Sequence, residues 1–330
     1  MLKLFARPLI VFARALIAAF VLFNAPANAA WPERTVTLVA PYPAGGLTDV
    51  MARLLAAELS IKFNQSFIVQ NVVGAGGTIG AAHVADATPD GHTLYFGPIG
   101  VVTLSPLTSN IRYDPESAFL PISILASTPF VVTVTEKFPA KTMAEFIALV
   151  NKKPDGFSYA SSGAGSTTHA AGVLFLKTAG LKMVHVPYRG VAPSLTALVS
   201  GEIEMSVLSP VELKPYIDSP KIRPLALTKK ARSQHMPNVP SIMDTFPEFP
   251  YVATYNGLMA PKGTPKEIID KLSKATREAV KNKTFSERLL KAGLEPIGST
   301  AVQMSEAIAA DRKNWLAIKD DLVASTSAKK

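Results

Sequence analysis

Short apolar runs rich in β-branched residues alternate along the chain with segments of helical periodicity. In the first third of the chain, the pattern predicts strands at 35–40, 66–70 and 93–97 and helices at 47–61 and 78–87. A β-rich stretch, 119–135, follows them. Such alternation is typical of a mostly parallel, open sheet with helices on both faces.

A second alternating block comes next. Its predicted strands are one that ends near 160, then 183–186, 204–208 and 223–228, and its predicted helices are 142–150, 166–178, 192–200 and 211–217. Beyond a proline-rich connection, 235–250, the pattern predicts a strand at 255–260 and helices at 265–282, 284–292 and 301–323. Two α/β blocks predict two lobes that share a cleft, because ligands of such sheets bind at the loops beyond the carboxyl ends of the strands.

The first 29 residues have the pattern of a secretory signal peptide. A basic start leads into a largely apolar run, 9–23, and Ala27-Asn28-Ala29 supplies small residues for cleavage. A membrane anchor is the alternative, but Arg14 interrupts the run, which is shorter than the ~20 residues of a spanning helix. We therefore expect residues 1–29 to be removed on export.

Composition narrows the class of protein. Removal of residues 1–29 leaves 301 of the 330 residues, which is the size of two domains. The chain has no cysteine, which excludes disulfides, thiol nucleophiles and thiolate metal sites. The net charge of +9 falls to +6 without the three cations of the leader. The remaining basic residues are dispersed, so we expect no nucleic-acid partner and a mild field that favours an anionic small solute.

The loop from Ala40 to Asp49 joins a predicted strand to a predicted helix. Gly45 and Gly46 allow a tight turn and bring backbone N–H groups close to a bound group. Thr48 or Asp49 can cap the helix. Because a helix start offers unpaired N–H donors and the positive end of the dipole, this loop suits an anion. A capped helix without any ligand is the alternative interpretation.

A second loop of the same kind spans residues 159–169. Its hydroxyl groups and glycine N–H groups can hold a carboxylate without burying a cation; the hydroxyls belong to Ser161, Ser162, Ser166 and Thr167. A third loop, 185–193, offers Tyr188 as a cleft wall. Its Arg189 can either pair with an anion or lie in solvent.

Signatures of catalysis and of cofactor binding are absent from the sequence. The turn 74–80 lacks the third glycine of a dinucleotide fingerprint, because Ile79 stands at that position. The five histidines are scattered, and neither an HExxH nor a GxSxG motif occurs. We therefore expect no enzyme, no cofactor and no metal. An acid–base pair of Asp49 and His169 is the alternative that would make this an exported enzyme.

In their order along the chain, these loops and their neighbours resemble the Bug family, the solute-binding receptors of tripartite tricarboxylate transporters. The matching motifs are Pro41-Tyr42-Pro43-Ala44-Gly45-Gly46 with Thr48-Asp49, Gly74-Ala75-Gly76-Gly77 with Ile79-Gly80-Ala81, Pro89-Asp90-Gly91 with Thr93-Leu94, Tyr159-Ala160-Ser161-Ser162-Gly163 with Gly165-Ser166 and His169, His185-Val186-Pro187-Tyr188 with Gly190 and Ala192-Pro193, and Ala260-Pro261 with Gly263-Thr264-Pro265. Each motif is weak alone, but their joint order covers nearly all of the mature chain.

The resemblance implies a monomeric periplasmic receptor with the periplasmic-binding-protein type II fold, an α/β fold of two lobes joined by two crossover segments. Residues 31–130 and 252–330 would form lobe one, and 131–251 lobe two. The receptor would deliver a small organic carboxylate to membrane transporter subunits or, alternatively, present it to the periplasmic domain of a sensor kinase. By analogy, the ligand would contact Tyr42, Ala44, Gly45, Gly46, Thr48 and Asp49 on one wall, and Ser161, Ser162, Gly163, Ser166, Thr167 and His169 on the other, beside Tyr188 and Arg189.

Departures from the family pattern bear on the ligand. Apolar residues replace frequent polar ones after Gly97, where the chain has Pro98, Ile99 and Val101. Leu208-Ser209 replaces a frequent Asp-Asn pair. If these positions face the cleft, the distal part of the ligand should be apolar or aromatic. The alternative is that they only pack the core.

Overall fold

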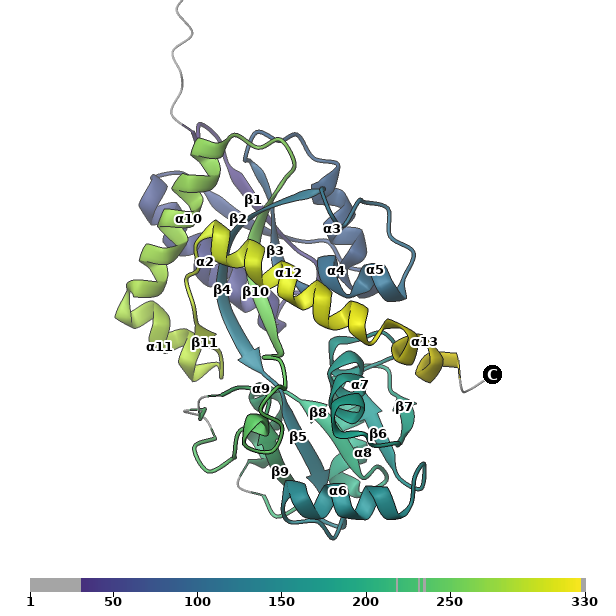
Figure 1. The fold of residues 1–330 in the computed structure, drawn as a ribbon. Coiled ribbons are helices and arrows are strands. Elements are labelled where there is room, and N and C mark those ends of the chain that lie inside the picture. The colour runs from purple at the N-terminus through teal and green to yellow at the C-terminus, as the bar shows by residue number, and fades with distance from the viewer. Residues whose placement is uncertain (1–30, 218, 231, 234–235, 328–330) are drawn as a thin grey trace, which may run out of the picture.

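Two α/β lobes meet at a narrow waist (Figure 1). This computed structural model describes residues 31–217, 219–230, 232–233 and 236–327. The predicted signal peptide, 1–29, and His235 in the proline-rich connection lie outside the described residues.

The first lobe contains a six-stranded mixed sheet. In the order β11-β4-β10-β3-β1-β2, its strands are Glu295–Pro296, Phe119–Pro129, Ala253–Pro261, Thr93–Pro98, Val36–Ala40 and Phe67–Asn71. Strand β1 runs parallel to β2 and β3, as the βαβ pattern predicts. Strand β10 is antiparallel to both β3 and β4, because it enters this sheet on its return from the other lobe. The expectation of a mostly parallel sheet is therefore wrong for this half of the sheet.

Helices cover both faces of the first sheet. They are α2 (Leu47–Phe63), α3 (Thr78–Ala85), α4 (Gly100–Thr103), α5 (Ser105–Thr108), α10 (Lys266–Lys281), α11 (Lys283–Lys291) and α12 (Ala301–Ala317), with the 3-10 turn η1 (Ala75–Gly77) before α3. Helix α2 buries Met51, Leu55 and Leu59 against the same core that receives Leu272 of α10. Burial of such side chains contributes roughly 1.5–3 kcal/mol each, which fixes α2 and the loop before it.

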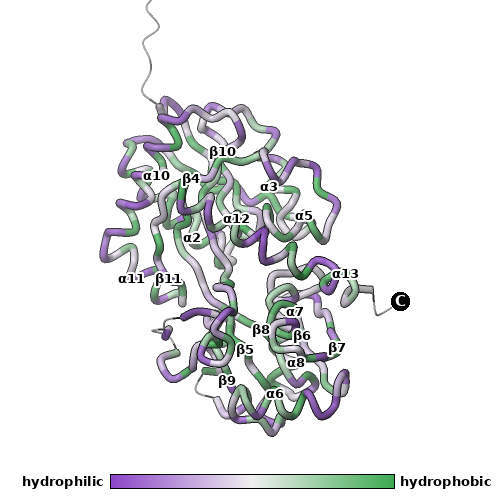
Figure 2. The backbone as a smooth tube through the Cα atoms, viewed as in Figure 1, coloured by the Kyte–Doolittle hydropathy of each residue, from purple (hydrophilic) through white to green (hydrophobic). Residues whose placement is uncertain are grey.

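The second lobe is built on a five-stranded sheet. In the order β7-β6-β8-β5-β9, its strands are Val184–Pro187, Ser158–Ser161, Met205–Leu208, Val131–Thr135 and Ile222–Leu227. Its helical elements are α6 (Met143–Lys152), α7 (Thr167–Ala179), α8 (Val191–Ser200), α9 (Pro210–Leu213), η2 (Lys214–Tyr216) and η3 (Ile242–Asp244). Hydrophobic residues follow the central strands of both lobes (Figure 2), so each lobe has a core of its own.

Two segments cross between the sheets, from β4 to β5 and from β9 to β10. They are bonded to each other at the waist. The Thr228 hydroxyl donates to the Val252 carbonyl at 2.6 Å, and the Phe130 N–H donates to the Thr228 hydroxyl at 2.9 Å. A single buried threonine thus connects both crossovers.

The C-terminal helices cross the waist a third time. The predicted helix 301–323 breaks at Ile318, and α13 (Lys319–Ser327) follows α12. Trp315, Ile318 and Leu322 are buried in the hydrophobic core of the second lobe, to which Phe175 of α7 also belongs. The end of the chain therefore packs on the second lobe, which differs from the assignment of all of 252–330 to lobe one. The precise lobe boundaries remain a prediction.

Among the described residues, no helix combines the length and the hydropathy that crossing a membrane requires.

Candidate functional site

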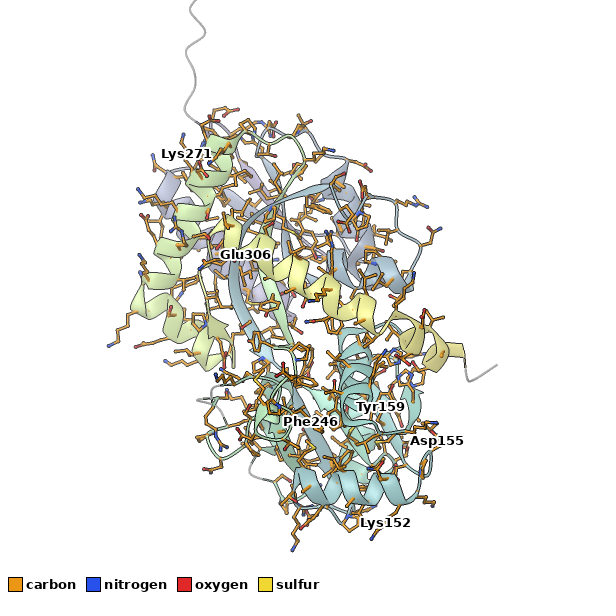
Figure 3. All side chains as sticks on the ribbon, viewed as in Figure 1. Lys152, Asp155, Tyr159, Phe246, Lys271 and Glu306 are labelled. Carbon is orange, nitrogen blue, oxygen red and sulfur yellow. The ribbon has the colours of Figure 1, made fainter. Side chains whose placement is uncertain are left out.

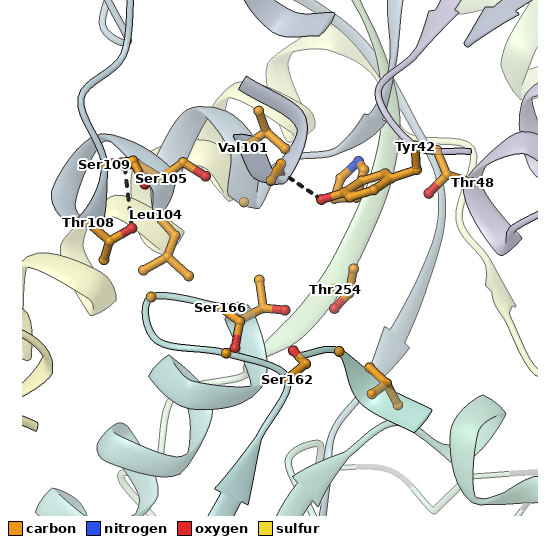
Figure 4. Close-up of a pocket in the computed structure, with 18 of the residues that line it drawn as sticks. Tyr42, Thr48, Val101, Leu104, Ser105, Thr108, Ser109, Ser162, Ser166 and Thr254 are labelled. Atoms are coloured by element: carbon orange, nitrogen blue, oxygen red, sulfur yellow. Dashed lines mark hydrogen bonds between the residues drawn. The ribbon is translucent and has the colours of Figure 1, made fainter. Parts of the chain in front are cut away.

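A cavity of about 680 Å³ lies between the lobes (Figure 4). Both predicted loops contribute to it from opposite sides. Nine of the predicted residues line it, namely Tyr42, Gly46, Thr48, Pro98, Val101, Ser162, Gly163, Ser166 and Thr167. The structure thus brings together residues that lie more than a hundred positions apart in the sequence.

The first wall is the start of helix α2. Gly46 is its N-cap, and within the described residues no side chain caps the helix. Neither Thr48 nor Asp49 therefore acts as the predicted N-cap. Gly46, Leu47 and Thr48 line the cavity, so the unpaired N–H groups of the first helical turn lie beside it. The Tyr42 hydroxyl, which donates to the Gly76 carbonyl at 3.1 Å, closes the wall toward the 74–77 turn.

The second wall is the start of helix α7. Ser166 is its N-cap, and the Ser166 hydroxyl accepts the His169 N–H at 3.2 Å. The hydroxyl groups of Ser162 and Ser166 lie 2.9 Å and 3.0 Å from the Thr168 hydroxyl. Each of these two hydroxyls can rotate its proton toward a ligand. The wall therefore offers hydrogen-bond donors whose oxygen atoms are positioned by Thr168. Two helix N-termini, each with a positive dipole end, therefore face one cavity.

The two walls touch at one end of the cavity. Gly165, in the left-handed region with φ +75°, lies so close to the first lobe that an added β-carbon would come within 2.7 Å of Thr108 Cβ. The lobes are therefore closed on each other at α5. Only glycine fits this position without a shift of the neighbouring helix.

Asp49 does not line the cavity and is buried beneath the first loop. It accepts the Gly45 N–H, the Arg53 Nε–H and the Asn71 side-chain amide, each at 2.9 Å. The hydrogen bond from Arg53 lowers the pKa of Asp49 to about 2, against the opposing effect of burial. The carboxylate is thus used to shape the loop. The prediction that it contacts the ligand is not supported by this placement.

His169 likewise points away from the cavity, into the second lobe. Its Nδ1 accepts the Gly165 N–H at 3.1 Å, and its Nε2 lies 2.9 Å from the Ser325 hydroxyl of α13. Its ring stacks on His185, with centroids 3.8 Å apart, and His185 stacks on Tyr159, which lies within the second lobe (Figure 3). Burial first, and the His185 ring second, lower the pKa of His169 to about 3. Ser161, predicted as a contact, is bonded to His185 Nε2 at 2.7 Å instead.

The remaining predicted residues also lie outside the lining. Ala44, Gly45 and Arg189 are exposed, and the Tyr188 hydroxyl donates to Glu202 at 2.8 Å, where burial and then Glu202 raise the pKa of Tyr188 to about 12. Of the specificity positions, Ile99 and Leu208 are fully buried in the lobe cores, and Ser209 caps α9. Only Pro98 and Val101 face the cavity, because the backbone turns into α4 between them.

Several lining residues escape sequence-based prediction. Those from the first lobe and the crossover are Leu47, Ala75, Gly76, Gly100, Leu104, Ser105, Thr108, Ser109 and Thr254, and those from the second lobe are Ala164, Gly165, Gly190, Val191 and Glu212. The hydroxyl cluster of α5 is a signal in the sequence, but a four-residue helix has no periodicity to place it. Only tertiary structure brings Thr254 and Glu212 to the cavity.

The lining contains no lysine, arginine or histidine within the described part of the chain. No cluster of three His, Cys, Asp or Glu side chains there could hold a metal ion. Asp49 and His169 lie on opposite walls, each tied to its own loop, so they do not form an acid–base pair. The site is therefore suited to holding an anion with neutral donors.

The chain is similar to known proteins along most of its length. The family described as tripartite tricarboxylate transporter family receptor matches residues 51–323. The protein BugT of Bordetella pertussis is 32% identical over 301 residues, which cover 89% of this chain and 91% of BugT.

Two solved structures from Rhodopseudomonas palustris are also similar. Rpa4515, solved with adipate, has a TM-score of 0.75 at 32% identity over 90% of this chain and 98% of its own. MatC, solved with malate, has a TM-score of 0.73 at 31% identity over 88% of this chain and all of its own, 100%. The fold is thus that of a two-lobed periplasmic binding protein. The chain belongs to the tripartite tricarboxylate transporter receptor family, whose members are periplasmic solute-binding receptors and not enzymes.

Proposed function

We propose that this protein captures a small organic carboxylate between its lobes and delivers it, chemically unchanged, to a tripartite tricarboxylate-type membrane transporter. The observation that carries the proposal is the pairing of two helix N-termini, α2 and α7, across one cavity without a basic side chain among its described lining residues. Such termini bind anions through N–H groups and dipoles. The two relatives were solved with adipate and malate, which are small organic carboxylates.

The part of the ligand beyond its carboxylate should be apolar or aromatic. Leu47, Pro98, Val101 and Leu104 line the cavity from the first lobe, and Val191 lines it from the second. Burial of apolar ligand surface on these side chains is worth about 25 cal/mol per Å². Export through the predicted signal peptide would place the receptor in the periplasm, where we propose that it acts as a monomer.

A thermal-shift screen of the purified exported protein tests the proposal. Alkyl and aromatic carboxylates form the panel, and the primary amide of each acid is its matched control. A true ligand should add about 2.7 kcal/mol of stability at a hundredfold excess over its Kd. We expect a shift with a carboxylate and none with its amide. Equal shifts with both, or turnover of a panel member, would contradict the proposal.

A further inference from the structure

Glu212 is the only acidic side chain among the described residues that line the cavity, and nothing basic lines it with Glu212. It lies on α9, which follows β8 at the waist where the lobes meet (Figure 1). This acid lies in the same lining as the two anion-binding helix N-termini, where it opposes a second ligand carboxylate.

The hydrogen bonds of Glu212 occupy only part of its carboxylate. Oε2 accepts the Ser209 N–H at 2.6 Å, and the Glu212 N–H donates to the Ser209 hydroxyl at 3.4 Å. These two bonds form the capping box of α9. Among the described residues, the hydrogen bonds to this carboxylate come from Ser209 alone, and no cation is paired with Glu212.

An ionised carboxylate that is partly out of water and lacks a cation is a strong acceptor for a charged donor. Burial raises the pKa of Glu212, which is the expected effect when no cation compensates the charge. The helix N-termini of α2 and α7 and the carboxylate of Glu212 give the cavity regions of opposite sign. A ligand that matches both regions carries both charges.

We propose that Glu212 selects zwitterionic ligands, with a carboxylate at the two helix N-termini, an apolar middle along Leu47 and Val101, and a protonated amine at Glu212. This inference rests on the proposed function and specifies the ligand class of the same cavity. A dicarboxylate would place its second anion in the region that Glu212 makes negative.

Three ligands of one chain length separate the possibilities: 6-aminohexanoate, hexanoate and adipate, measured by calorimetric titration of the purified exported protein. The variant Glu212→Gln keeps an amide oxygen that can accept the Ser209 N–H, so α9 stays capped while the charge is lost. Glu248→Gln is the matched control, since Glu248 is exposed and does not line the cavity.

The wild type should bind 6-aminohexanoate at least roughly tenfold more tightly than hexanoate or adipate, which is the scale of a hydrogen bond to a charged group. Glu212→Gln should abolish this preference, and Glu248→Gln should leave it intact. Equal binding of all three, tighter binding of adipate, or a preference unchanged in Glu212→Gln would overturn the inference but leave a carboxylate receptor standing. If none of the three binds the wild type, the inference fails, and the proposed function fails with it only if the wider carboxylate panel also gives no shift.

Discussion

Gly100 of the first lobe faces Thr167 of the second so closely that an added β-carbon would lie 3.0 Å from Thr167 Cγ2. Both residues line the cavity, one at the start of α4 and the other at the start of α7. The absence of a side chain at Gly100 therefore allows the two walls to approach this closely.

The variant Gly100→Ala tests this relationship. The added methyl group should hold the walls apart by a few tenths of an ångström and weaken ligand binding by roughly tenfold, since tight packing tolerates little extra volume. The unliganded protein should melt no lower, because alanine favours the helical backbone of α4. The double variant Gly100→Ala with Thr167→Ser removes the opposing methyl group and should restore affinity. A double variant as weak as the single one would refute the steric explanation.

Asp49 should matter for the shape of the first loop. Asp49→Asn loses the charged acceptor of the Gly45 N–H and the ion pair with Arg53, so the free energy of unfolding at pH 7 should fall by about 1–3 kcal/mol. Because the folded pKa is depressed to about 2, the stabilising effect is present above pH 3.8 and is lost as the pH falls through 2. Urea unfolding at pH 7 measures the loss, with exposed Asp86→Asn as the control.

His169 should make the protein sensitive to acid. Its folded pKa of about 3 lies below the ordinary value of 6.5, so the unfolded chain binds the proton more readily. Its contribution to stability is present above pH 6.5 and decreases as the pH falls toward 3. In His169→Asn, whose side-chain oxygen can still accept the Gly165 N–H, melting temperatures between pH 7 and pH 4 should fall less steeply than in the wild type. An unchanged slope, or an equal effect of exposed His83→Asn, would count against this role.

Asp311 should act in the opposite direction. It is buried on α12, where Thr103 donates to it at 3.2 Å, and burial raises its pKa to about 7. The folded state keeps this proton while the unfolded chain loses it near pH 3.8, so the stabilisation is present below pH 3.8 and lost as the pH rises through 7. Asp311→Asn should therefore gain stability relative to the wild type between pH 5 and pH 8. Denaturant titrations at pH 5 and pH 8 measure this gain in unfolding free energy, and Asp320→Asn, at an exposed position, is the control. A difference between Asp311→Asn and the wild type that does not change with pH would disprove the prediction.

Sequence periodicity locates the helices and strands that bury apolar residues on one face. Helix α2 and strands β1 to β3 fall within a few residues of their predicted bounds, because their apolar residues form the core. The short helices α4 and α5 escape prediction, since four residues bury too little surface to leave a pattern. The antiparallel entry of β10 and the crossing of α13 depend on contacts between distant parts of the chain.

The candidate site shows the same division. The sequence places both glycine and hydroxyl loops at the cavity, because strand ends followed by helix starts define where ligands bind in α/β sheets. It does not distinguish a polar side chain that faces the ligand from one that supports its own loop. Asp49 and His169 are of the second kind, since each binds the N–H of a glycine four residues before it.

Calorimetric titration of the best carboxylate from the screen, against the wild type and the double variant Ser162→Ala with Ser166→Ala, tests the central claim most directly. We expect one ligand per protein, recovered chemically unchanged, and affinity at least roughly tenfold lower when the two hydroxyl groups are removed. Full affinity in the double variant, or a chemically altered ligand after release, would contradict a receptor that holds its solute between these two walls.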